Sequence, residues 1–125
     1  MFKTGDVVRF DSDVADKVKF HLCISVDNHF IFLNSPKIRS FAGDFEILSS
    51  DITGLAPTPE GKSIASCNTV MQLTSEQLIA RNSKCVGTVK YAVLKRLLLF
   101  VEGLTTIETE VKNSIIDGLG DTVGL

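Results

Sequence analysis

The chain has 125 residues, of which 44% are hydrophobic and 22% charged, the balance of one ordinary globular domain rather than a disordered segment. Its formal net charge of −2 excludes a protein that coats nucleic acid by bulk positive charge, although a local basic patch is compatible with it. The apolar run 97–101 is too short to cross a bilayer, and residues 1–10 lack the apolar core of a signal peptide.

The three cysteines, at positions 23, 67 and 85, are an odd number and include no C-x-x-C pair. A disulfide framework requires an even set, and a zinc site requires clustered ligands. We therefore expect reduced thiols in a cytoplasmic protein, with no metal, no cofactor and no contact with a membrane.

The first half of the chain consists of short runs in which apolar and polar residues alternate, as in strands. The expected strands cover 7–10, 20–26, 29–34, 43–48 and 63–73. A long loop rich in Pro, Gly, Ser and Thr, Ser49 to Lys62, separates the last two. About five short strands joined by loops and a hairpin predict a small, strongly bent sheet or barrel.

The second half has the periodicity of helices. TSEQ at 74–77 has the form of a capping box, and the helix that it begins is expected to end near Asn82. Thr88 is expected to cap a longer helix whose apolar stripe is 89, 93, 97, 101 and 104, with its end at Gly103. A third helix is expected over 107–117, ended by Gly118 and Gly120. The prediction is a single domain, 1–125, with a β-barrel portion, 1–73, and a C-terminal portion of two to three helices, 74–125.

The hairpin KFHLCISVDNHFIFLNSP, Lys19 to Pro36, carries the candidate site. If Asp27-Asn28 forms a two-residue turn, counting outward from it places His21 directly opposite Asn34. Opposed side chains lie about 5 Å apart at Cβ, and Lys19 points to the same face as His21. An ammonium, an imidazole and an amide are therefore predicted to converge at the open end of the hairpin.

The same pattern also has an explanation without function. Strand ends are polar where they meet solvent, and a cross-strand His–Asn pair contributes at most about 1 kcal/mol. The loop that follows, SPKIRS, brings Ser35, Lys37 and Arg39 to this end. Two cations on a short loop suit a phosphate contact, and they equally suit a solvated surface.

The order of these segments resembles the PemK/MazF family of toxin proteins over residues 5–102. The features that carry the resemblance are GDVV near the start, a strand ending at Ser25, a second ending in NSP, and then TSEQL and VGTVKYAVLKRL. The resemblance implies an SH3-like barrel with a C-terminal helix. It also implies a homodimeric, metal-independent endoribonuclease of a toxin–antitoxin system, with RNA and a cognate antitoxin protein as partners.

In that family the active site pairs an arginine at the start of the second strand with a threonine or serine after the third. The matching positions here are Lys19 and Ser35, and the usual Arg-Pro is Lys19-Phe20. Lysine supplies charge without the planar fork that grips a phosphate. We hypothesise that His21 serves as general acid or base, because an imidazole titrates near neutral pH.

Two hypotheses follow. The first is a toxin-like endoribonuclease, with Lys19, His21 and Ser35 as catalytic residues and Asn34, Lys37 and Arg39 as substrate-binding residues. The second is a non-catalytic SH3-like module that binds a protein or nucleic acid on the barrel face beside the loop Ser49 to Lys62. The acidic total favours the second hypothesis, and the shared layout favours the first.

Overall fold

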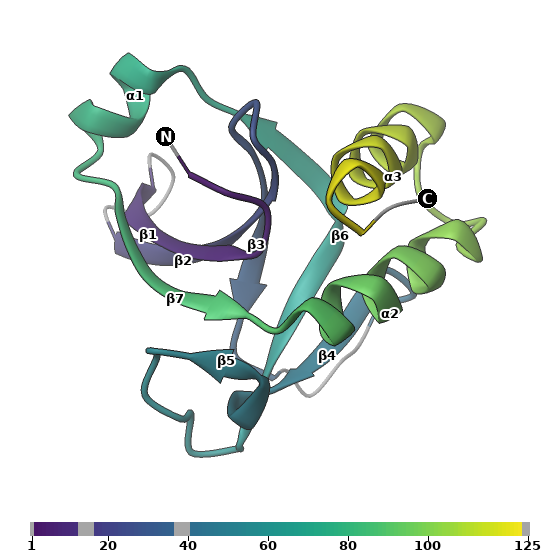
Figure 1. The fold of residues 1–125 in the computed structure, drawn as a ribbon, viewed down its shortest axis with the longest axis horizontal. Coiled ribbons are helices and arrows are strands. Elements are labelled where there is room, and N and C mark those ends of the chain that lie inside the picture. Colours follow the sequence, from purple (N-terminus) through teal and green to yellow (C-terminus); the bar gives the residue numbers. More distant parts are fainter. Residues whose placement is uncertain (1, 13–16, 37–40, 124–125) are drawn as a thin grey trace.

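A computed structural model describes residues 2–12, 17–36 and 41–123 of the chain. Within them, seven antiparallel strands form one sheet in the order β4-β6-β3-β2-β1-β7-β5, and the sheet curls into a nearly closed barrel (Figure 1). The strands are β1 Asp6–Ser12, β2 Lys17–Ser25, β3 His29–Asn34, β4 Asp44–Leu48, β5 Ile52–Thr53, β6 Lys62–Gln72 and β7 Lys84–Val89. This confirms the predicted fold class, a small β-barrel with C-terminal helices.

Three α-helices accompany the barrel in the described residues, α1 Ser75–Ala80, α2 Tyr91–Glu102 and α3 Thr109–Val123, with a short 3-10 helix, η1 Ser49–Asp51, between β4 and β5. Helices α2 and α3 pack against each other on one side of the barrel, and α3 also contacts β2 and β6 (Figure 1). Helix α1 lies apart from them, beyond the end of β6. Its predicted capping box is confirmed, because Gln77 N–H donates to Thr74 Oγ1 (3.1 Å) and Thr74 N–H to Gln77 Oε1 (2.8 Å).

The prediction of a helix capped by Thr88 is wrong, because this segment is strand β7 and α2 begins only at Tyr91. Thr88 pairs with Asp6 of β1 and with Thr53 of β5, so the last part of the barrel comes from the portion expected to be helical. Within KCVGTV, Gly87 and Val89 are buried and Thr88 between them is exposed, which is the alternation of a strand. Gly87 also lets β5 approach, because a Cβ there would lie 2.8 Å from the Thr53 carbonyl oxygen.

Helix α3 continues through Gly118 and Gly120 to Val123, so the expected stop at these glycines is also wrong. Close packing against β2 explains why Gly118 lies inside the helix. A Cβ at Gly118 would overlap the carbonyl oxygen of Ile24 and lie 2.9 Å from the Cβ of Ser25. Gly118 therefore allows α3 to lie directly against β2, and this tertiary contact outweighs the weak helix propensity of glycine.

The apolar side chains form two clusters on opposite faces of the sheet. The larger one lies under α2 and α3 and includes Leu22, Ile24, Ile31, Leu97 and Leu119. The smaller one consists of Val8, Phe10, Cys23, Phe30 and Leu78, with Phe2, Met71 and Leu73 packed around it. Successive residues of the hairpin strands therefore alternate between the two clusters, as a strand requires. The pairing between the two strands, however, differs from the expected one.

The hairpin turn has three residues, Val26 to Asn28, where two were expected. Asn28 takes the left-handed conformation (φ 63°), and its N–H donates to the Ser25 carbonyl (3.2 Å). A bulge between Cys23 and Ser25 shifts the register once more. The two shifts together displace the pairing by two residues, which preserves the face of the strand residues before the bulge and changes their partners. Ser25, beyond the bulge, instead turns to the side of α3.

Candidate functional site

The structure does not bring the predicted trio together. His21 pairs with Phe32, and Asn34 pairs with Ile64 of β6, so the predicted His21–Asn34 contact is wrong. The two-residue displacement of the hairpin is the physical reason. Lys19 is half-buried and pairs with Phe10 of β1. Lys37 and Arg39, predicted to bind substrate, lie outside the described residues.

His21 is a core residue. Its side chain is 1% exposed and stacks on Phe10, with ring centroids 3.6 Å apart and an interplanar angle of 5°, and it also contacts Phe32. Its Nδ1 atom has no hydrogen-bond partner within the described part of the chain. A catalytic acid or base has to reach its substrate, and this imidazole reaches no described cavity. Its burial contradicts the role of proton carrier expected from the sequence.

Burial also keeps the imidazole neutral. Desolvation lowers the pKa of His21 from 6.5 to about 4, and the charges of Arg81 and Lys19 act in the same direction. Backbone groups of Val8 and Lys19 partly offset this lowering of the pKa. At neutral pH His21 therefore behaves as an aromatic packing residue.

Asn34 and Ser35, by contrast, do lie at a cavity. They line a groove of about 220 Å³ at the end of the barrel where β3 ends and β6 begins, here called the strand-end groove. Apolar side chains dominate its lining, and the polar groups are hydroxyls and one amide. The lining residues are Phe20, Leu33, Asn34, Ser35, Leu55, Ala56, Thr58 and Ser63.

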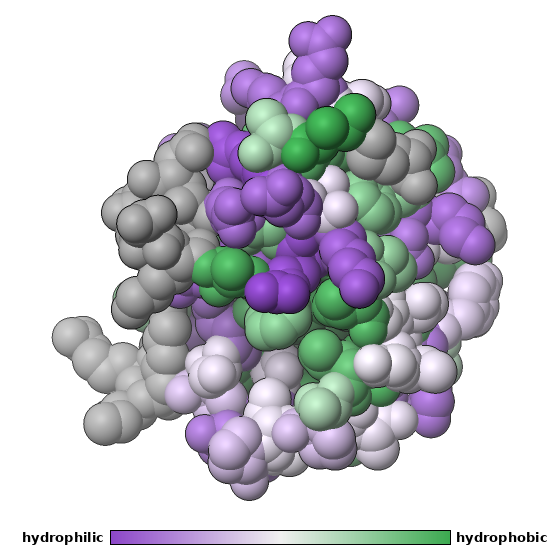
Figure 2. Space-filling model, turned by 90° about the vertical axis from the view of Figure 1, so that its left-hand side faces the viewer, coloured by the Kyte–Doolittle hydropathy of each residue, from purple (hydrophilic) through white to green (hydrophobic). Residues whose placement is uncertain are grey.

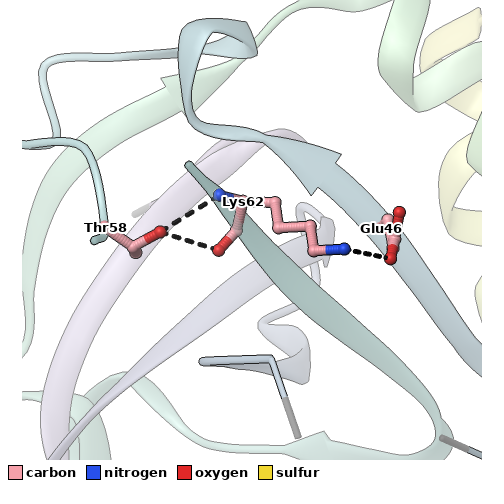
Figure 3. A network of polar contacts seen from close by, with 3 residues as sticks. All are labelled: Glu46, Thr58 and Lys62. Carbon is pink, nitrogen blue, oxygen red and sulfur yellow. Dashed lines mark hydrogen bonds and ion pairs between the residues drawn. The ribbon is translucent and has the colours of Figure 1, made fainter. Parts of the chain in front are cut away.

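One wall of the groove is the loop between β5 and β6, which is seen at the bottom of Figure 1. The Thr58 hydroxyl donates to the Lys62 carbonyl (2.8 Å) and accepts from the Lys62 N–H (3.1 Å), as Figure 3 shows. Thr58 N–H donates to Ser49 Oγ (3.3 Å), so the loop is tied at both of its ends. This network holds Leu55 and Ala56 over the groove.

An ion pair continues the network on the surface, where Lys62 Nζ donates to Glu46 Oε1 at 2.8 Å (Figure 3). The two side chains are 36% and 61% exposed, so the pair contributes little to stability. Lys62 is not part of the groove lining, and in the described part of the chain no lining residue is charged. The polar contacts that the groove offers are therefore hydrogen bonds from neutral groups.

A second cavity shares Asn34 with the first and lies on the opposite face of the sheet. It has a volume of about 280 Å³, and Asn34, Phe41, Asp44, Ile64, Ser66 and Asn68 line it. We call it the amide pocket, after its two asparagines. Sequence reasoning missed all of its residues except Asn34, although the spacing of Ser66 and Asn68, two apart on one strand, places polar groups on one face.

Within the described residues, no three His, Cys, Asp or Glu side chains lie close enough to hold a metal ion. Cys23 and Cys67 are buried, and burial raises the pKa of their thiols to about 11 and about 12, whereas Cys85 is exposed. The two buried thiols therefore pack as small apolar groups. In the part of the chain that the structure describes, no helix is long and apolar enough to cross a membrane.

No protein-family model matches the chain, and no curated protein is significantly similar to it. The site must therefore be interpreted from its own chemistry.

Proposed function

We propose that this protein binds single-stranded RNA in the strand-end groove. The observation that carries the proposal is the chemistry of the lining, which combines an aromatic ring and an apolar floor with amide and hydroxyl groups and includes no acidic side chain. Single-stranded RNA is recognised by stacking of its bases on apolar and aromatic side chains and by hydrogen bonds to its polar edges.

Each part of the lining has a role in this proposal. Phe20 is 37% exposed and offers its ring to a base. Asn34, Ser35 and Thr58 offer hydrogen bonds to ribose and phosphate oxygens. With a net charge of −2, the chain has no bulk attraction for a polyanion, so affinity has to come from these local contacts.

A second candidate function is cleavage of the bound RNA by a toxin-like endoribonuclease. It is supported by the position of Ser35, which follows the third strand as in the PemK/MazF family and lines the groove. Lys19 lies at the same end of the neighbouring strand, and its ammonium would stabilise the charge that develops at phosphorus. His21 has no part in this reaction, because it is buried. A homodimer and a cognate antitoxin belong to this second candidate.

A binding assay tests the first candidate. We expect anisotropy of a fluorescein-labelled single-stranded RNA to show saturable binding that weakens about tenfold in Phe20→Ala, the usual loss when a stacking ring is removed. Leu99→Ala is the matched control, because Leu99 is 63% exposed on α2, far along the chain from the groove. Equal binding by both variants, or no binding by the wild type, would refute the proposal.

A cleavage assay separates the two candidates. A doubly labelled RNA incubated with the protein in EDTA should lose its quenching if the second candidate is right, and Ser35→Ala with Lys19→Ala should abolish that signal. Binding without cleavage would support RNA binding and exclude the endoribonuclease. Growth arrest on induction of the wild-type gene, but not of the Lys19→Ala variant, would support the toxin.

A further inference from the structure

The amide pocket has the features of a site for one nucleobase. It shares Asn34 with the strand-end groove but opens on the opposite face of the sheet, because Ile64 of the pocket pairs with Asn34 whereas Leu33 of the groove pairs with Ala65. An RNA strand that passes around the end of β3 can therefore place a neighbouring base in the pocket. We propose that the amide pocket accepts a guanine base of the RNA. This inference rests on the proposed function, since it specifies which base the same strand presents.

The pocket is held ready by its own backbone. Asp44 N–H donates to the Phe41 carbonyl (3.0 Å), and Phe41 N–H donates back to Asp44 Oδ2 (2.9 Å). Cys67 N–H donates to the Gly43 carbonyl (2.9 Å), which ties this turn to β6. The wall that carries Phe41 and Asp44 is thereby fixed against the strand that carries Ser66 and Asn68, and little ordering is required when a ligand enters.

The shape of the lining suits a flat ring. Phe41 is 58% exposed and presents its ring at one side, and Ile64, 9% exposed, forms an apolar floor. A glycine at position 43 makes room for the Asn68 amide, because a Cβ there would lie 2.5 Å from Asn68 Oδ1. A planar base stacked on Phe41 therefore has amide groups at its edge.

The polar groups of the lining select the base. Asp44 uses Oδ2 for Phe41 and has Oδ1 without a hydrogen bond within the described residues, while Asn34 makes no side-chain hydrogen bond there. Asn68 Nδ2 donates only a long bond, 3.5 Å, to Ser66 Oγ. The pocket thus offers one carboxylate acceptor and amide groups that donate and accept.

Guanine fits this set best. Its N1–H and N2–H donors face a carboxylate acceptor, and its O6 accepts from an asparagine NH₂. Uracil has one N–H donor between two acceptors, and adenine places an acceptor beside its amino group, so each offers the Asp44 carboxylate one donor where guanine offers two adjacent donors. The carboxylate also repels phosphate, so that the base and not the backbone enters the pocket.

The test compares RNA strands of equal length, one of uridines only and one with a single central guanosine. We expect the wild type to bind the guanosine strand about tenfold more tightly. Asp44→Asn keeps an oxygen for the Phe41 N–H and should lose this preference while still binding the uridine strand. Asp117→Asn, on the exposed face of α3, is the matched control and should keep the preference.

A second measurement does not depend on any variant folding. Titration of the wild type with guanosine should shift the backbone amide resonances of Phe41 and Asn68, whereas uridine should not. Equal affinity for the two strands, with no shift on adding guanosine, would overturn the base assignment and leave RNA binding intact. Shifts with guanosine but no binding of either strand would support the pocket and overturn the proposed function.

Discussion

The burial of His21 predicts that acid destabilises this protein in a defined pH range. The imidazole is 1% exposed and its pKa falls from 6.5 to about 4 on folding. Between these two values the unfolded chain binds a proton that the folded chain excludes. Stability is therefore fully present above about pH 6.5 and is lost progressively as the pH falls toward about 4.

The magnitude follows from the two pKa values. A lowering from 6.5 to about 4 corresponds to about 3 kcal/mol when the whole range is crossed. Between about pH 7.5 and about pH 5 the His21 contribution to the free energy of unfolding should fall by about 2 kcal/mol. A change of this size is a large part of the 5 to 15 kcal/mol that is typical of a domain, so it is readily measured.

Urea unfolding at the two pH values checks this prediction. His21→Phe keeps a ring to stack on Phe10 and cannot bind a proton, so its loss of stability between the two pH values should be about 2 kcal/mol smaller than that of the wild type. Comparing each protein with itself removes any difference in packing between them. If both proteins lose the same stability, the imidazole is not held neutral by burial, and the core assignment of His21 is refuted.

Three further substitutions test other parts of the fold. Thr74→Ala removes the capping box of α1 and should lower the free energy of unfolding by about 1 kcal/mol in a urea titration, whereas Thr74→Ser should not. Gly118→Ala adds a Cβ that overlaps the Ile24 carbonyl, so it should cost about 2 kcal/mol in the same assay, although alanine favours helices; equal stability would mean that α3 does not lie against β2. Thr58→Val removes the hydroxyl that joins the ends of the β5–β6 loop, and the Lys62 amide hydrogen should then exchange about tenfold faster. Unchanged exchange at Lys62 would show that other contacts hold the groove wall.

Local patterns predicted most of the fold. Period-two alternation identified five of the seven strands in the described residues, including β3 with its bounds, and the capping box located α1. Strand β7, Lys84–Val89, was not predicted, because Val89 fits the apolar stripe of the following helix and Thr88 was expected to cap that helix. Its pairing with β1 and β5 is a long-range contact, which no local window contains.

Composition alone did not indicate the site, because the apolar residues of its lining do not form one stretch of the sequence. Figure 2 views the side of the molecule on which α1, β1 and β7 lie, and hydrophobic and hydrophilic residues alternate across it without one large apolar area. The strand-end groove joins residues from β2, β3 and the β5–β6 loop, so its apolar lining is discontinuous in the sequence. The loop Ser49 to Lys62 was nevertheless expected beside a ligand, and three of its residues, Leu55, Ala56 and Thr58, line the groove.

The pairing of β2 with β3 was predicted wrongly for a physical reason that also affects the site. The left-handed Asn28 and the bulge after Cys23 each insert one residue, and the two insertions together restore the original facing of the β2 residues up to Cys23. Facing could therefore be predicted from alternation while pairing could not. His21 consequently lies against Phe32 in a core cluster, and Asn34, two residues further along β3, is left at the junction of the two cavities. Asn34 therefore lines two cavities, whereas the His21 imidazole is buried in the core.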